Sequence, residues 1–513
     1  MITAITVLVA LGFLGWGFYR ARPFGKLGLV AWFQSVVLIA PWLLFFGLSI
    51  VGIYLNIVSV LFLFVLSTGL YIYLGNRLRS LAQTEVLARR ANAIANGEDT
   101  SPTATNGDPD STTPDSVASQ APPTKASEAL PASDISPIPA EDLKAIQSIF
   151  GIDTFFATET IPYQEGVILR GNLRGEAEAT VARLSEQLLG KVGTSETNPQ
   201  QPRYRLFLVE GQDSKPVVIV LPSSRDPQPS SLFQKGIAVL LFLATIAASL
   251  ESGGLMLGFD FFTAPNRVAE VLPLAAGILS VLAMHELGHW VLARRYQVRL
   301  SLPFFIPTWQ IGSFGAVTRF ESVLPNRSVL FDIAIAGPAA GGILSLGMLI
   351  TGLLLSHKGS LFQIPTEFFQ GSILVGTLTR VVLRESLQQS IVDVHPLVVL
   401  GWLGLVITAL NLLPAGQLDG GRIVQAIYGR KIAGRTTIAS IVVLGLASIV
   451  NPLALYWAIV VLFLQRELER PSQNELTEPD DTRAALGLLA LFLMIVTLLP
   501  LTPSLAGRLG IGG

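Results

Sequence analysis

The chain has 513 residues, of which 50% are hydrophobic and only 14% are charged. Soluble globular proteins carry about a quarter charged residues, so this composition indicates a membrane protein. The net charge of -1 provides no basic field for binding nucleic acid. Because the chain has no cysteine, disulfides, thiol nucleophiles and thiolate metal ligands are excluded.

Three apolar segments fill residues 1–75, and each approaches the roughly 20 residues that cross a bilayer. They are Ile2–Tyr19, Leu27–Leu48 and Ile53–Leu74. Basic residues follow the first and third segments, which places the N-terminus outside and the chain after Leu74 in the cytoplasm. Residues 76–138 are predicted to be a cytoplasmic helix and a linker. The linker should be disordered from residue 95, because its Ser, Thr, Pro and Asp side chains bury too little apolar surface.

Residues 139–222 change character and predict a small soluble α/β module on the cytoplasmic side. Helical spacing of apolar residues covers Glu141–Phe150 and Glu176–Leu189. Strand-like runs cover Gly166–Leu169, Arg205–Val209 and Pro216–Leu221.

Residues 232–500 return to membrane-like composition and form the second predicted domain. Spans are expected at 232–250, 267–293, 329–355, 396–413 and 484–500. The 438–464 stretch is interrupted at Asn451 and Pro452, so it predicts either one long span or a hairpin of two. The short 371–383 segment is expected to be re-entrant. The predicted fold is therefore an α-helical polytopic membrane protein with a small soluble α/β domain.

The 267–293 span contains the sequence His285-Glu286-Leu287-Gly288-His289. Residues four apart share one face of a helix, so both imidazoles can bind one metal ion. Zinc suits imidazole and carboxylate ligands, and Glu286 is placed to take a proton from a zinc-activated water. Ionisable residues at membrane depth are costly and functional by default. An alternative is that the motif is retained in a scaffold protein that has lost its catalytic activity.

A third ligand is expected near the same membrane face. His357 and His395 fall at the opposite face and are predicted to be loop residues. Asp419 is better placed, because basic residues follow both it and His289. The alternative for Asp419 is a turn residue before two glycines.

The two segments together resemble the site-2 protease family of intramembrane zinc metalloproteases. The resemblance implies that His285, His289 and Asp419 bind Zn²⁺ and that Glu286 is the catalytic base. It also implies that Asn411 positions the substrate or polarises its carbonyl. The expected substrate is a transmembrane helix of another protein, cleaved within the lipid bilayer near the cytoplasmic face; the oligomeric state is unknown.

Further motifs are similar to those of a plant and cyanobacterial branch, whose plastid members are named ethylene-dependent gravitropism-deficient and yellow-green. They are Gly171-Asn172-Leu173-Arg174, Leu302–Pro307 and Gly312–Ala316. Two departures from the wider family also fit this branch. The run from Pro414 lacks a Pro-x-Pro pattern, and Ala336–Gly342 lacks an asparagine. The resemblance covers about residues 140–500 and implies a plasma, thylakoid or plastid membrane.

Several alternatives remain open at this point. An inactive scaffold or chaperone would keep the fold without turnover, and a transporter would need charged groups on several spans or an inverted repeat. An aspartyl protease would need Asp332 to pair with Asp419, which leaves the His-Glu motif unexplained. The 298–327 loop is too short for a PDZ-like insert, so the 139–222 module is the candidate regulator or substrate reader. Residues 302–320 are expected either to offer an edge strand to the substrate or to shield the metal.

Overall fold

The computed structural model describes residues 2–50, a few positions between 63 and 78, and residues 138–511 except 164, 196–198, 200, 212–214, 450–451 and 463–466. The chain divides into two compact units, Met1–Ser127 and Glu128–Gly513. The first unit contains α1 (Ile2–Ala21), the 3-10 helix η1 (Arg22–Phe24) and α2 (Gly25–Ile50). Trp32 of α2 donates a hydrogen bond to the Leu14 carbonyl of α1. The predicted third span and linker lie largely outside the described residues.

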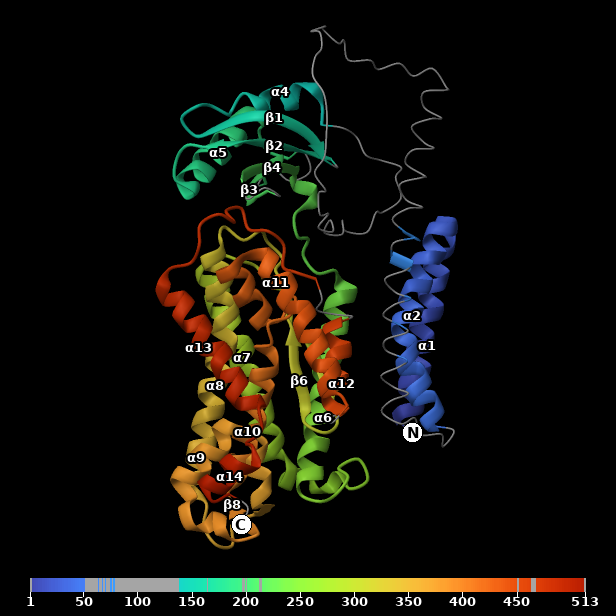
Figure 1. Cartoon of the computed structure of the whole chain (residues 1–513), viewed down its shortest axis with the longest axis vertical. Helices are drawn as coiled ribbons and strands as arrows, with labels where there is room; N and C mark the ends of the chain where they lie inside the picture. The colour runs from blue at the N-terminus through green and yellow to red at the C-terminus, as the bar shows by residue number, and fades with distance from the viewer. Residues whose placement is uncertain are drawn as a thin grey trace, which may run out of the picture. The chain divides into compact units, whose positions relative to one another are not determined.

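The second unit begins with a four-stranded antiparallel sheet, and two helices cover one face of it (Figure 1). The strand order is β1-β2-β4-β3. The elements are α4 (Ala140–Gln147), β1 (Phe155–Tyr163), β2 (Gly166–Leu173), α5 (Ala177–Val192), β3 (Tyr204–Glu210), β4 (Pro216–Pro222) and η2 (Ser223–Arg225). Both predicted helices and all three predicted strands are present. β1 was not predicted, because it is an edge strand whose residues are mostly exposed and lack clear alternation.

The Gly171–Arg174 motif ends β2 and fastens the edge strand β1. A Cβ atom on Gly171 would lie 2.1 Å from the carbonyl oxygen of Phe156, so only glycine fits against that strand. The Arg174 N–H donates to the Thr154 carbonyl at 2.9 Å. The motif therefore has a structural explanation in the close pairing of β1 and β2.

Long apolar helices make up the rest of the second unit. Four of the described helices are long and apolar enough to cross a membrane, at Leu232–Met256, Pro265–Arg295, Arg327–Leu355 and Asp481–Leu498. The helices are α6 (Leu232–Met256), η3 (Pro265–Arg267), α7 (Val268–Arg295), α8 (Arg327–Leu355), η4 (Thr366–Gly371), α9 (Ile373–Leu383), η5 (Arg384–Gln388), α10 (Pro396–Asn411), α11 (Asp419–Ala447), α12 (Pro452–Val460), α13 (Asp481–Leu498) and α14 (Pro503–Leu509).

Two segments that were ambiguous in the sequence are now defined. The 438–464 stretch belongs to two helices, α11 and α12, which pack against each other. The 371–383 segment forms the short helix α9, which packs in one hydrophobic cluster with β7 (Phe362–Pro365), β8 (Ile391–Val394) and α14.

The centre of this unit is formed by α7, α8 and α10, with a β-hairpin beside them (Figure 1). The hairpin consists of β5 (Phe304–Thr308) and β6 (Gly312–Val317), and both strands contact α6. A capping box between Ser231 and Gln234 starts α6. Arg294 and Arg295 end α7, where the negative end of the helix dipole stabilises their positive charge. These long helices carry the residues singled out in the sequence toward one point.

The loop between α12 and α13 joins the soluble sheet to the helical core. Its residues 469–475 are called the bridging segment below. The Leu208 N–H of β3 donates to the Gln473 carbonyl at 2.8 Å, and the Glu475 N–H donates to the Leu208 carbonyl at 2.9 Å. On the other side, the Gln473 N–H donates to the Leu324 carbonyl, just before α8, at 2.9 Å. The bridging segment thus extends the sheet edge and contacts the helical core at once.

Candidate active site

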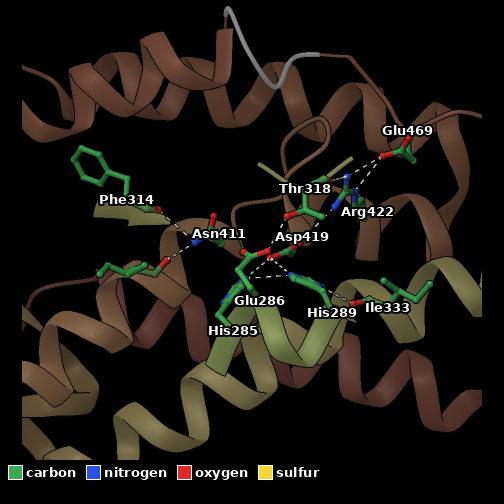
Figure 2. A network of polar contacts seen from close by, with 11 residues as sticks. His285, Glu286, His289, Phe314, Thr318, Ile333, Asn411, Asp419, Arg422 and Glu469 are labelled. Atoms are coloured by element: carbon green, nitrogen blue, oxygen red, sulfur yellow. Dashed lines mark hydrogen bonds and ion pairs between the residues drawn. The ribbon is translucent and has the colours of Figure 1, made fainter. Parts of the chain in front are cut away.

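Two helices bring three potential metal ligands together in the core (Figure 2). His285 and His289 lie one turn apart on α7, and Asp419 is the first residue of α11. The Nε2 atoms of the two histidines are 3.2 Å apart, and the Oδ2 atom of Asp419 lies 3.1 Å from His285 Nε2 and 3.4 Å from His289 Nε2. All three side chains are buried. The sequence separation of 134 residues between His285 and Asp419 is closed by the packing of α7, α8, α10 and α11.

The donor atoms suit a zinc ion. His289 Nδ1 donates a hydrogen bond to the Ile333 carbonyl at 2.7 Å, which leaves the Nε2 lone pair directed at the cluster. Two imidazole nitrogens and a carboxylate oxygen that face one another in a buried site are stabilised by a cation among them. In a tetrahedral zinc site with ligand distances of about 2.0–2.1 Å, neighbouring donor atoms lie about 3.3 Å apart. The observed spacing of 3.1–3.4 Å fits such an ion.

Glu286 lies on the same turn and faces the same cavity, with His289, Asn411 and Asp419. The Thr318 hydroxyl, just after β6, donates to its Oε2 atom at 2.7 Å. The carboxylate is therefore held beside the cluster by a partner from another element (Figure 2).

Arg422, one turn further along α11, contacts Asp419 on the side away from His285. Its Nη1 atom lies 3.8 Å from Oδ1 of Asp419, the carboxylate oxygen that does not face His285. Its Nη2 atom donates to the Thr318 carbonyl at 2.7 Å and to Glu469 at 3.0 Å. A carboxylate in the first turn of a helix is also favoured by the helix dipole, so Arg422 and the dipole both favour the observed place of the Asp419 carboxylate.

Asn411 ends α10 and borders the cavity, but both of its N–H donors already have protein partners. Nδ2 donates to the Ile407 carbonyl at 3.0 Å and to the Phe314 carbonyl of β6 at 3.4 Å. Asn411 therefore fastens β6 to α10 in this structure.

The cavity beside the cluster measures only about 10 Å³. Such a volume holds about one water molecule and no peptide. Residues 316–318 of the hairpin end and residues 417–419 form parts of its lining. A substrate must displace part of this lining to reach the histidines.

The remaining candidates lie elsewhere. The His395 N–H donates to Ser356, so His357 and His395 share the far end of α8 and α10. Since α10 has 16 residues, that end lies about 24 Å from Asn411. Asp332, the possible aspartyl partner of Asp419, instead accepts hydrogen bonds from Arg483 of α13 at 2.7 Å.

Comparison with known proteins identifies the family. A family model described as Peptidase family M50 matches residues 273–451, and one described as the EGY3 middle domain matches residues 144–229. The chain is 39% identical over 401 residues to the probable zinc metalloprotease EGY1, chloroplastic, of Arabidopsis thaliana, covering 71% of this chain and 72% of that protein. The chain belongs to peptidase family M50.

Other relatives place this M50 peptidase in the EGY branch. It is 37% identical over 363 residues to the probable zinc metalloprotease EGY2, chloroplastic, of Arabidopsis thaliana, covering 69% of this chain and 63% of the relative. It is 33% identical over 379 residues to the probable zinc metalloprotease EGY3, chloroplastic, of Oryza sativa subsp. japonica, with shares of 69% and 63%. No solved structure matches the chain. The predicted family, branch and fold class are thus confirmed.

Three residues of this M50 peptidase's site were not anticipated from its sequence: Thr318, Arg422 and Glu469. Thr318 follows a short strand, and Glu469 lies in a loop 180 positions after His289, so spacing along the chain gives no signal for either. Arg422 stands three residues after Asp419, a spacing that puts both on one helix face. That spacing was the one available signal.

Gly337 of α8 tests how tightly the ligands are packed. A Cβ atom there would lie 2.2 Å from His289 Nε2, so Gly337→Ala must displace that imidazole. We expect zinc retention against a chelator to weaken at least about tenfold, as when a ligand loses its orienting partner. Gly347→Ala on the same helix has open space around its Cβ and should retain zinc normally. Equal zinc content in both variants would contradict the proposed ligand geometry.

Proposed function

We propose that this protein is an intramembrane zinc metalloprotease that cleaves transmembrane helices of other membrane proteins. The observation that carries the proposal is the buried cluster of His285, His289 and Asp419, with Glu286 beside it, inside apolar helices. The predicted enzyme class and zinc cofactor are confirmed by the family and the named relatives. The intact His-Glu motif also argues against a retired scaffold, and peptidase membership argues against a transporter.

Each residue of the site then has a defined task. His285, His289 and Asp419 would hold the zinc ion, which would supply a Lewis acid for the substrate carbonyl and for water. Glu286 takes the proton from the attacking water and passes it to the leaving amine. Thr318 keeps the Glu286 carboxylate aimed at the cavity. The hydrogen bonds of Asn411 favour a role in holding β6 over direct polarisation of the carbonyl.

The site lies inside the bilayer but close to one face. His289 is six residues from Arg295, the basic end of α7, a rise of about 9 Å along the helix. By the positive-inside rule this end faces the cytoplasm or its plastid equivalent. We assign the protein to a plastid or thylakoid-type membrane, because the named relatives are chloroplastic. At this depth water reaches the site over a short path while the substrate helix stays in lipid.

The hairpin is the element that receives the substrate. Among the described residues β6 forms a two-stranded sheet with β5, and the Phe314 carbonyl of β6 accepts a hydrogen bond from Asn411 of α10. An extended peptide can add to the edge of such a sheet by main-chain hydrogen bonding, which also unwinds a helical substrate for attack. Since the cavity holds about one water, binding requires β6 or the 417–419 turn to move aside.

Cleavage of defined helices tests this function. Purified protein should cut single-span helices carrying a central Gly or Pro pair faster than matched all-Leu helices, because unwinding is easier there. Removal of zinc with a chelator should abolish cleavage, and added zinc should restore it. Cleavage that survives zinc removal would overturn the metalloprotease assignment. Stoichiometric zinc without cleavage of any helix would favour the scaffold alternative.

A further inference from the structure

We propose that Thr318, Arg422 and Glu469 form a positioning relay that makes the orientation of the base Glu286 depend on the bridging segment, and thereby on docking of the soluble sheet. This inference rests on the proposed protease function. It explains how residues 139–222 could affect the orientation of Glu286. The sequence motifs do not predict such a connection.

Thr318 is the residue at which the relay meets the active site. Its hydroxyl donates to Glu286 at 2.7 Å, and its carbonyl accepts from Arg422 at 2.7 Å (Figure 2). Thr318 is buried, and both of these partners are protein groups. One residue is thus held through its main chain by Arg422 and holds the base through its side chain.

Arg422 connects three parts of the site. Besides Thr318, it contacts the outer carboxylate oxygen of Asp419 at 3.8 Å and binds Glu469 at 3.0 Å. Its guanidinium also lies 4.8 Å from the ring centre of Phe320. A planar guanidinium has a fixed fork of donors, so a change in one partner shifts the direction of its other hydrogen bonds. The place of Glu469 therefore sets the place of Thr318.

Glu469 is buried and is held in place by hydrogen bonds to other protein groups. Its side chain is buried against Arg422, and its main-chain carbonyl accepts from Gln425 and Arg430 of α11. It begins the bridging segment, whose later residues pair with the edge of β3. The next residue, Arg470, donates to the Arg225 carbonyl at the end of the sheet module at 2.8 Å. Displacing the module therefore pulls on the segment that anchors Arg422.

A second observation supports a junction able to adjust. A cavity of about 130 Å³ separates the outer face of β3 and β4 from the bridging segment, and Phe320 and Glu469 both border it. This cavity is partly open at the surface, so the two parts are not packed tightly against each other there. The module and the core therefore meet through hydrogen bonds at the segment, with empty space beside them that allows small rearrangements.

Substitution of Thr318 tests the active-site end of the relay. Thr318→Val keeps the shape and removes the hydroxyl, so kcat should fall about 10- to 100-fold, as expected for a misplaced base, with KM and zinc content unchanged. Thr318→Ser keeps the hydroxyl and should restore kcat to within a few fold of wild type. Wild-type kcat in Thr318→Val, or equal losses in the two variants, would overturn the relay.

The distal end is tested by a double-mutant cycle. Glu469→Gln should lower kcat about tenfold by weakening the charge-assisted bond to Arg422, whereas Glu467→Gln, an exposed change of the same charge, should not. In the Thr318→Val background, Glu469→Gln should cost little more, because both act through one hydroxyl. Equal losses in both backgrounds would show that Glu469 acts by another route and would overturn the proposal.

Hydrogen exchange supplies a readout independent of activity. Glu469→Gln should speed amide exchange in residues 318–320 and 473–475, while Glu467→Gln leaves both segments at wild-type rates. Unchanged exchange at 318–320 in Glu469→Gln would contradict the relay. Failure of the relay and failure of the proposed function are distinguishable, because wild-type cleavage of the helix panel is measured first.

Discussion

Glu286→Gln is expected to abolish proteolysis while leaving the zinc site intact. Gln has the same shape as Glu, and its amide oxygen can still accept from the Thr318 hydroxyl, so the local packing is preserved. It cannot take a proton from water, and loss of a general base costs about 100- to 10,000-fold in kcat. Elemental analysis should find zinc equal to wild type, because the Glu286 side chain lies beside the three ligands rather than among them.

Glu270→Gln is the matched control for this change. Glu270 lies on the same helix, is exposed and pairs with Arg267 at its first turn, so its substitution changes the same charge far from the cluster. It should leave kcat and zinc content at wild-type values. Cleavage by Glu286→Gln at the wild-type rate would remove Glu286 from the base role. Loss of zinc in that variant would assign the carboxylate to the metal instead.

The helical part of the fold is readable from the sequence because membrane spans leave a strong local signal. Runs of about 20 apolar residues placed α7, α8 and α13 within three positions at each end, and α6 continues six residues beyond its predicted end. The strand β1 escaped, since an exposed edge strand has little burial to produce alternation. The contact between the soluble sheet and the helical core was not predicted, for a different reason. It is made largely by main-chain hydrogen bonds of residues 473–475, which do not depend on the type of side chain and so leave no signal in the sequence.

The site residues likewise fall into those that the local sequence predicts and those that only tertiary contacts reveal. His285, Glu286 and His289 sit within one helical turn, so their spacing alone predicts a shared face. Asp419 was found through topology, which puts both segments at one membrane face. Thr318 and Glu469 depend on tertiary contacts between elements far apart in the chain, and a lone Thr or Glu has no spacing that reveals its partner. What a sequence predicts well here is the local geometry of ligands, and what it misses is the support around them.

Closure of the site gives this support a functional meaning. In the proposed protease, a cavity with room for about one water would protect membrane proteins from indiscriminate cleavage, because a helix cannot enter without rearrangement. Entry requires the hairpin end or the turn at residues 417–419 to move, and Arg422 contacts both through the Thr318 carbonyl and the Asp419 carboxylate. Opening and catalytic alignment are therefore linked through one guanidinium.

Asp419→Asn is expected to lose zinc, and with it all activity. Asn keeps the shape of Asp but lacks the negative charge that offsets the metal ion between two neutral imidazoles. Even partners outside the ligand shell cost 10–100-fold in metal affinity when removed, so loss of this ligand should weaken zinc binding by at least about 100-fold. Competition with a chelator of known affinity, measured alongside cleavage, gives both quantities on one preparation.

Asp332→Asn is the control that separates a metalloprotease from an aspartyl protease. Asp332 pairs with Arg483 and Tyr296, so its loss weakens the packing of α8 against α13 and should lower thermal stability. It should nevertheless retain zinc and cleave at near the wild-type rate, because its carboxylate is committed to those partners. Abolished cleavage in Asp332→Asn with zinc retained would revive the aspartyl pair. Full zinc retention by Asp419→Asn would show that Asp419 is not a zinc ligand. The third ligand of the proposed site would then have to be another residue.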